Sequence, residues 1–190
     1  LPHTEVRSFC VSPDGDVIVT TSQGAARISR DRVTSFPLPE GAPKVVDEIA
    51  FAKDGALLLG SARQGLFVFR DGKLSRAGKP VGDSVSVLHL GHGGTLWVGG
   101  LGWGLAGLKE GSSPEALGTA EGLPSNAVTA ILEDRRGGLW VGTDRGLFWR
   151  TGNRGVRVLD ARSGLPDSYV YWVGEDREVF VNCQYGDRKS

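Results

Sequence analysis

One glycine-rich string has the residue types and spacing of a nucleotide site. Residues 102–107 read "GWGLAG" and match G-x-G-x-x-G, the pattern that holds a dinucleotide pyrophosphate between a strand and a helix. Such a site needs a helix directly after the glycines, because the helix N-terminus binds the phosphate. The residues that follow, "LKEGSSPEALG", are too short and too broken for that helix. We therefore expect a turn between two strands here and no cofactor.

An acidic string, "EDRRGGLW" at residues 133–140, is similar to the Asp-box turn of sialidase-type propellers, S-x-D-x-G-x-x-W. The spacing from Asp134 to Gly137 is one residue too long for that motif, and the leading serine is absent. Aspartates in turns commonly accept hydrogen bonds from backbone N–H groups. We therefore expect Asp134 to have a structural role.

The remaining candidates for chemistry are two histidines and two cysteines. His89 and His92 have no third ligand or paired carboxylate spaced with them, and no Ser-His-Asp set or glycosidase carboxylate pair stands out. Cys10 and Cys183 lack a CxxC pattern and are expected to be buried small residues; whether they pair stays open. The sequence therefore predicts no catalytic residue and no metal site.

The composition limits the fold class and the partners. The 190 residues are 39% hydrophobic and 23% charged with a net charge of zero, so the chain can bury a core. Scattered Lys and Arg residues provide no field for nucleic acid or anionic lipid, and no apolar run approaches the roughly 18 residues of a membrane span. We expect neither nucleic-acid binding nor membrane contact by this segment. Twenty-nine glycines indicate many tight turns and an all-β fold.

A repeat of about 40 residues orders the chain. Turn positions recur every 39 to 43 residues at Gly15, Gly55, Gly94, Gly137 and Arg177. A second column consists of Gly24, Gly65, Gly104, Gly146 and Gly186. A third column consists of Val6, Val46, Val85, Val128 and Val170. Three columns in one register indicate a repeated structural unit.

Each full unit reads as four short strands. In the clearest unit we expect strands at 127–134, 138–143, 146–152 and 156–161, with apolar residues on both faces as in a sheet packed between neighbours. This pattern predicts a β-propeller of four-stranded antiparallel blades, four full units and a partial fifth. The units span about 1–41, 42–81, 82–123, 124–165 and 166–190. Trp97 and Trp140 share one position in the second strand and are expected in the core.

Residues 121–150, "EGLPSNAVTAILEDRRGGLWVGTDRGLFWR", closely resemble the two-component regulator propeller repeat, with its GLP, its Val/Ile strand and its D-x-x-G-x-L-W-V-G-T string. Residues 163–186 match the first half of that repeat, but Arg177 replaces the glycine and Phe180 the tryptophan. The resemblance implies a periplasmic or extracytoplasmic sensor region of a bacterial membrane signalling protein, commonly a histidine kinase or hybrid two-component sensor and sometimes a diguanylate cyclase. Some members recognise carbohydrates.

Family propellers usually have seven blades, so the resemblance also implies that this chain is a fragment. Its open edges would then meet the remaining blades of the same propeller or another chain. The number of blades, the output domain and the oligomeric state stay open.

In a propeller, the connections between strands two and three and those between blades lie on one face, around the mouth of the central channel. The candidate ligand-binding residues on this face are Trp103, Arg63, Gln64, Asp144, Arg145, Asn126, Asp167, Tyr169, Gln184 and Tyr185. Aromatic, amide and charged groups together suit a sugar, although an ordinary polar loop surface has the same composition. Trp103 is the clearest candidate, because a tryptophan between glycines in a turn has little core to enter.

The sequence therefore predicts a non-enzymatic domain that senses a small molecule or an oligosaccharide, or that mediates an interaction. One alternative is a propeller enzyme of lyase or glycan-cleaving type, in which His, Glu or Asp groups with perturbed pKa values would converge at the channel mouth. A virginiamycin lyase-like enzyme would need a catalytic histidine and metal ligands there. The other alternative is a structural platform with a flat apolar face.

Overall fold

The computed structural model describes residues 5–30, 32–151, 155–176 and 178–183. In these residues the regular structure is β-strand apart from two 3-10 helices, η1 (Thr119–Glu121) and η2 (Ala161–Ser163). The strands of the first two sheets are β1 (Val6–Val11), β2 (Val17–Thr21), β3 (Gly24–Ser29), β4 (Arg32–Phe36), β5 (Glu48–Phe51), β6 (Leu57–Ser61), β7 (Gly65–Arg70) and β8 (Lys73–Arg76). The later strands are β9 (Val87–Leu90), β10 (Leu96–Gly100), β11 (Gly104–Leu108), β12 (Glu115–Leu117), β13 (Val128–Glu133), β14 (Gly138–Thr143), β15 (Gly146–Thr151), β16 (Val156–Leu159), β17 (Val170–Glu175) and β18 (Val179–Cys183).

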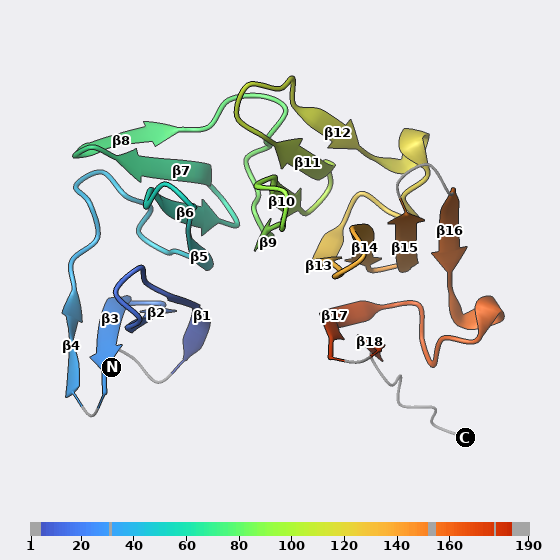
Figure 1. Ribbon diagram of the computed structural model, residues 1–190, viewed down its shortest axis with the longest axis horizontal. Coiled ribbons are helices and arrows are strands. Elements are labelled where there is room, and N and C mark those ends of the chain that lie inside the picture. The colour runs from blue at the N-terminus through green and yellow to red at the C-terminus, as the bar shows by residue number, and fades with distance from the viewer. Residues whose placement is uncertain (1–4, 31, 152–154, 177, 184–190) are drawn as a thin grey trace. The chain divides into compact units, whose positions relative to one another are not determined.

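The strands form four four-stranded antiparallel sheets and one two-stranded sheet (Figure 1). Each sheet is a meander in chain order, from β1–β4 through β5–β8, β9–β12 and β13–β16 to β17–β18. The predicted all-β class and the four-stranded units are thereby confirmed. Among the described residues, no helix is long and apolar enough to cross a membrane.

In the fourth sheet, the strand bounds agree closely with those predicted from the sequence. Its strands begin and end within two residues of the predicted bounds. The largest difference is at the end of β16, where the predicted strand continued to residue 161. The strand ends earlier because Asp160 Oδ1 accepts hydrogen bonds from the N–H groups of Arg162 and Ser163, both at 2.9 Å, which starts η2.

The chain divides into two compact units, residues 1–88 and residues 89–190. In the first unit, Ile18 of β2 packs against Ile49 of β5 and Leu59 of β6, all at most 3% exposed. The core therefore lies between the facing sides of the first two sheets. Both Cys10, in this unit, and Cys183, in the other, are free thiols.

The core of the second unit contains a close approach between the fourth and fifth sheets. Val170 and Val173 of β17 pack against Ala130 and Leu147 of the fourth sheet. A Cβ atom on Gly142 of β14 would lie 2.7 Å from a methyl group of Val170. The glycine of the "WVG" string therefore leaves room for the valine that begins the next unit, which explains why both recur at the repeat period.

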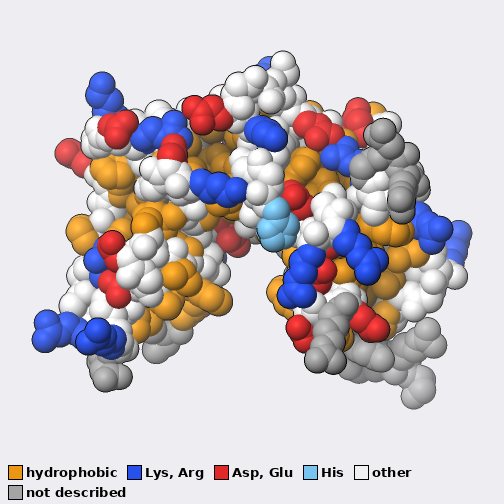
Figure 2. Space-filling view, in the orientation of Figure 1, with side chains coloured by type: hydrophobic (Ala, Val, Ile, Leu, Met, Phe, Trp, Pro, Cys, Tyr) orange, Lys and Arg blue, Asp and Glu red, His pale blue; other side chains and the backbone are white. Residues whose placement is uncertain are grey.

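Charged side chains of both signs are interspersed over the face seen in Figure 2. This distribution agrees with the net charge of zero.

Candidate functional site

The turns between the second and third strands are shaped by a hydroxyl at the end of the second strand. Thr143 Oγ1 accepts a hydrogen bond from Arg145 N at 3.1 Å and donates to Gly146 O at 2.8 Å. Thr21 does the same in the first sheet, with Gln23 N at 3.2 Å and the next glycine oxygen at 3.1 Å. The hydroxyl therefore fixes the turn backbone that carries the candidate ligand-binding side chains.

We expect Thr143→Val to lower the free energy of unfolding by about 1–3 kcal/mol, because the buried partners of the hydroxyl lose their hydrogen bonds while the volume is kept. Thermal or chemical unfolding measures this change. Thr143→Ser, which keeps the hydroxyl, is the matched control, and an equal loss in both variants would contradict the assigned role.

Asp144, in the turn after β14, has an unusual carboxylate. Its backbone N–H donates to Ala127 O at 3.3 Å. Its Oδ1 atom is buried and has no hydrogen-bond partner among the described residues. Arg145 beside it is exposed. A buried carboxylate oxygen without a donor is costly, and such groups call for a specific explanation such as a bound molecule.

In the first unit, two exposed candidates, Arg63 and Gln64, share the turn after β6. This turn is held by the Asp47 carboxylate, whose Oδ2 accepts from Ala62 N at 2.7 Å. Arg7 donates to Asp47 Oδ1 at 3.0 Å from the neighbouring sheet. Arg7 and Asp47 thus lie beside the predicted residues, although the sequence reading did not select them.

The repeat itself contains a pattern that marks the position of Arg7 and Asp47. The position after the valine column is occupied by Arg7, Asp47, Ser86, Thr129 and Tyr171, all of which carry hydrogen-bonding groups. In β1, β13 and β17 the strand register shifts at this position, which is the mark of a β-bulge. Bulges re-aim side chains and are common near binding sites.

Trp103 and Asn126 are brought together by the structure. The N–H groups of Gly102 and Gly104, which flank Trp103, both donate to Asn126 O, at 2.9 and 3.0 Å. The Asn126 side-chain oxygen accepts from Thr119 N at 2.9 Å. Trp103 itself is half-buried. The turn that carries the tryptophan is therefore held by the start of the next unit.

Two candidates of the fifth unit, Asp167 and Tyr169, lie just before β17. Asp167 Oδ1 accepts from Tyr169 N at 2.9 Å. The rings of Tyr169 and the exposed Tyr171 have centroids 4.7 Å apart and a tilt of 42°. Gln184 and Tyr185 lie outside the described residues. The ligand-binding role of all these candidates stays a prediction.

Asp134 has the structural role that its sequence context predicted. Its Oδ1 accepts from Arg136 N at 2.9 Å and Gly138 N at 2.7 Å, and its Oδ2 accepts from Trp140 Nε1 at 2.7 Å. Burial raises the pKa of Asp134, but the bonds from Trp140, Gly138 and Arg136 together lower it below the usual value. Trp140 stacks on Trp149 with 4.9 Å between ring centroids. In the described part of the chain, no group of three His, Cys, Asp or Glu residues is placed to hold a metal.

The sequence matches a known repeat family in one region. Residues 122–145 match the family described as two component regulator propeller. Among curated proteins, none matches the sequence significantly.

Several solved structures are similar to this chain. The extracellular domain of BT3049 from B. thetaiotaomicron, assigned to a hybrid two-component system, aligns with a TM-score of 0.78 at 17% identity over 96% of this chain and 26% of its own. The extracellular domain of BT4673 from the same organism, with the same assignment, gives 0.76 at 20% identity over 97% and 26%. Virginiamycin B lyase from Staphylococcus aureus gives 0.67 at 17% identity over 94% and 63%.

The chain spans about a quarter of the length of the two extracellular domains. At these identities the likeness concerns the fold. The meander sheets, their period and the matched residues agree with one another: the chain has the blade architecture of propeller proteins and carries a two-component regulator propeller repeat.

Proposed function

We propose that this chain is part of the extracytoplasmic sensor region of a bacterial membrane signalling protein and that it binds a ligand without changing it. The regulator propeller repeat and the structural likeness to extracellular domains of two-component systems support this proposal. The output domain, a histidine kinase or a diguanylate cyclase, would lie elsewhere in the parent protein.

The observation that carries the proposal is the carboxylate of Asp144. Its buried Oδ1 lacks a donor among the described residues, and a ligand hydroxyl would supply one if the turn opens on binding. The exposed guanidinium of Arg145 offers several donors to ligand oxygens. Donors and acceptors at such close spacing suit a polyhydroxylated molecule, so an oligosaccharide is the ligand class we favour.

Exposed apolar side chains on the first and on the fifth sheet support a further partner at each of these two sheets. Phe9 on β1 is 69% exposed, whereas Ile49, at the same repeat position in β5, is 3% exposed because it packs on the preceding sheet. Trp172 and Phe180 in the fifth sheet are 55% and 54% exposed. We propose that further blades of the same propeller, or another chain, cover these residues.

A lyase is the second candidate, favoured by the likeness to virginiamycin B lyase, of which a His-to-Ala variant is catalytically inactive. The histidine arrangement favours binding instead, because His89 Nε2 already accepts a hydrogen bond from Glu133 N at 3.0 Å. A lyase would convert its substrate, so product analysis separates the two functions.

Isothermal titration calorimetry with a panel of soluble oligosaccharides tests the proposed site. We expect saturable binding of at least one oligosaccharide and a loss of about tenfold or more in affinity in Asp144→Asn, equivalent to about 1.4 kcal/mol. Asp16→Asn, in a turn between the first two strands, is the control. No binding across the panel, or equal affinity in Asp144→Asn and the wild type, would contradict the proposal.

A further inference from the structure

In the fourth sheet, Trp140 donates its indole N–H to Asp134 of the same sheet. The third sheet has no such internal bond, and a contact with the fourth sheet takes its place. Asp134 has no carboxylate counterpart in the third sheet, because Gly91 occupies the same repeat position. Trp97, the counterpart of Trp140, donates its indole N–H to Glu133 Oε2 of β13 instead, at 3.3 Å. A Cβ atom on Gly91 would overlap Glu133 Oε2, so the glycine makes room for the incoming carboxylate.

The backbone of Glu133 contacts the third sheet as well. β13 is an edge strand, and the neighbouring Asp134 N bonds inside the sheet to Gly138 O at 2.8 Å. Because successive N–H groups of a strand point to opposite sides, Glu133 N points away from β14 and needs another acceptor. His89 Nε2 on β9, the edge strand of the third sheet, is that acceptor at 3.0 Å. Glu133 is therefore bonded twice to the third sheet.

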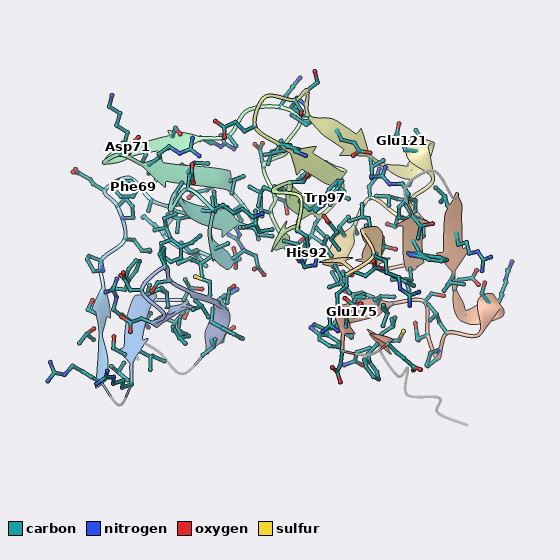
Figure 3. The ribbon with its side chains drawn as sticks, viewed as in Figure 1. Phe69, Asp71, His92, Trp97, Glu121 and Glu175 are labelled. Atoms are coloured by element: carbon teal, nitrogen blue, oxygen red, sulfur yellow. The ribbon has the colours of Figure 1, made fainter. Side chains whose placement is uncertain are left out.

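Further contacts join consecutive sheets near Glu133 and Trp97. The Arg150 guanidinium of β15 lies 5.9 Å from the Trp97 ring centroid and pairs with Glu115 of β12, with Nη2 to Oε2 at 3.2 Å. Glu175 of β17, at the repeat position of Glu133, likewise reaches back one sheet, and its Oε2 accepts from Arg135 N at 2.9 Å. Figure 3 labels Trp97, His92 and Glu175 in this region. In both the fourth and the fifth sheet, a glutamate at the end of the first strand therefore bonds to the preceding sheet.

We propose that His89 is a pH-sensitive switch in the contact between the third and fourth sheets, closed when the imidazole is neutral and released when it is protonated. A neutral imidazole has one nitrogen that accepts a hydrogen bond, whereas both nitrogens of the imidazolium are donors. On protonation, the Glu133 N–H would face another N–H at 3.0 Å. The imidazolium would also attract the Glu133 carboxylate away from the Trp97 indole.

The surroundings of His89 have opposite effects on its pKa. Burial lowers its pKa most strongly, the Glu133 carboxylate raises it, and His92 on the turn between β9 and β10 lowers it; the net pKa lies below the usual 6.5. The folded protein therefore binds this proton less readily than the unfolded chain. The hydrogen bond to Glu133 N holds until the pH drops through the folded-state pKa of His89. The contribution of this group to stability is complete above pH 6.5 and falls over the range from 6.5 down to that folded-state pKa.

NMR titration of the imidazole signals tests the proposal directly. The chain has three histidines, so the variants His92→Gln and His89→Gln assign each signal. We expect His89 to titrate with a midpoint below 6.5, and the Glu133 amide and Trp97 indole N–H signals to shift with the same midpoint. A His89 midpoint at or above 6.5, or Glu133 and Trp97 signals that do not follow it, would overturn the proposal.

Thermal unfolding between pH 8 and pH 5 gives a second readout. The amide oxygen of His89→Gln can accept the Glu133 hydrogen bond and does not titrate, so this variant should lose less of its melting temperature on acidification than the wild type. His92→Gln changes an exposed histidine three residues away. Because His92 lowers the pKa of His89, this variant should narrow the pH dependence but retain more of it than His89→Gln. Parallel curves for the wild type and His89→Gln would overturn the switch. If His89→Gln does not fold, the titration of the wild type decides, with His3→Gln and His92→Gln assigning the other two imidazole signals.

Discussion

Asp134→Ala is expected to lower the free energy of unfolding by about 3–5 kcal/mol, measured by urea or thermal unfolding. The substitution removes the acceptor of two backbone N–H groups and of the Trp140 indole N–H. Each hydrogen bond to a charged group contributes about 1.5–3 kcal/mol, and the donors left behind in the turn are partly or fully buried. This is a large part of the stability of a typical domain.

The graded control is Asp134→Asn. Its amide oxygen can accept from Arg136 N and Gly138 N, but its NH2 group faces the Trp140 indole donor, so about half of the loss should remain. Trp140→Phe should cost less than Asp134→Ala, because it removes one of the three bonds. A change below about 1 kcal/mol for Asp134→Ala would show that the carboxylate does not hold the turn.

Gly104→Ala should lower the free energy of unfolding by about 3–5 kcal/mol, whereas Gly24→Ala should lower it by about 1–2 kcal/mol. Both glycines follow the turn between strands two and three, with φ of 89° and 135°, which a side chain resists. A Cβ on Gly104 would also overlap the carbonyl oxygen of Leu117, while a Cβ on Gly24 meets nothing within 4 Å.

The difference between the two variants isolates the close approach from the backbone strain that they share. Leu117 pairs with Leu105 in the third sheet, so its carbonyl cannot move without disturbing the pairing of β11 and β12. Chemical unfolding of both variants measures the difference. Equal losses would mean that the backbone contact at Gly104 relaxes freely.

Much of the blade could be predicted from local pattern. The glycine that follows the turn recurs at the repeat period, and Gly104 shows the reason, because it combines a positive φ with a close approach to the backbone of Leu117. The structural role of Asp134 is confirmed because a turn aspartate bonds mainly to residues within a few positions of itself. The buried Trp97, 6% exposed, agrees with the expected core position. These features depend on interactions inside one unit.

The features that the sequence reading missed depend on neighbouring units. Glu133 takes the place of the aspartate that the third sheet lacks at Gly91, and it bonds to Trp97, 36 positions away. No local pattern indicates this contact. The same holds for Arg7, which lies beside Asp47 of the next sheet. The bulges at Arg7, Thr129 and Tyr171 are set by strand pairing, which a period of about 40 residues does not define.

The candidate site likewise combines features that the repeat predicts with features that depend on how the units pack. The turns that carry Arg63, Asp144 and Arg145 lie between strands two and three, as the repeat predicted. The side-chain oxygens of Asn126 and Asp167 bond to the backbone, so these two residues contribute to the shape of the surface. The unsatisfied Oδ1 of Asp144 is visible only in the packed structure, because it depends on which donors surround the turn.

The central claim is that this chain binds a ligand without converting it. Calorimetric titration with the oligosaccharide panel, followed by mass spectrometry of the sugar recovered after prolonged incubation, tests it most directly. The account predicts saturable binding that Asp144→Asn weakens at least about tenfold, with the sugar recovered at unchanged mass. Recovery of a cleaved or eliminated product, or no binding by any sugar of the panel, would contradict it.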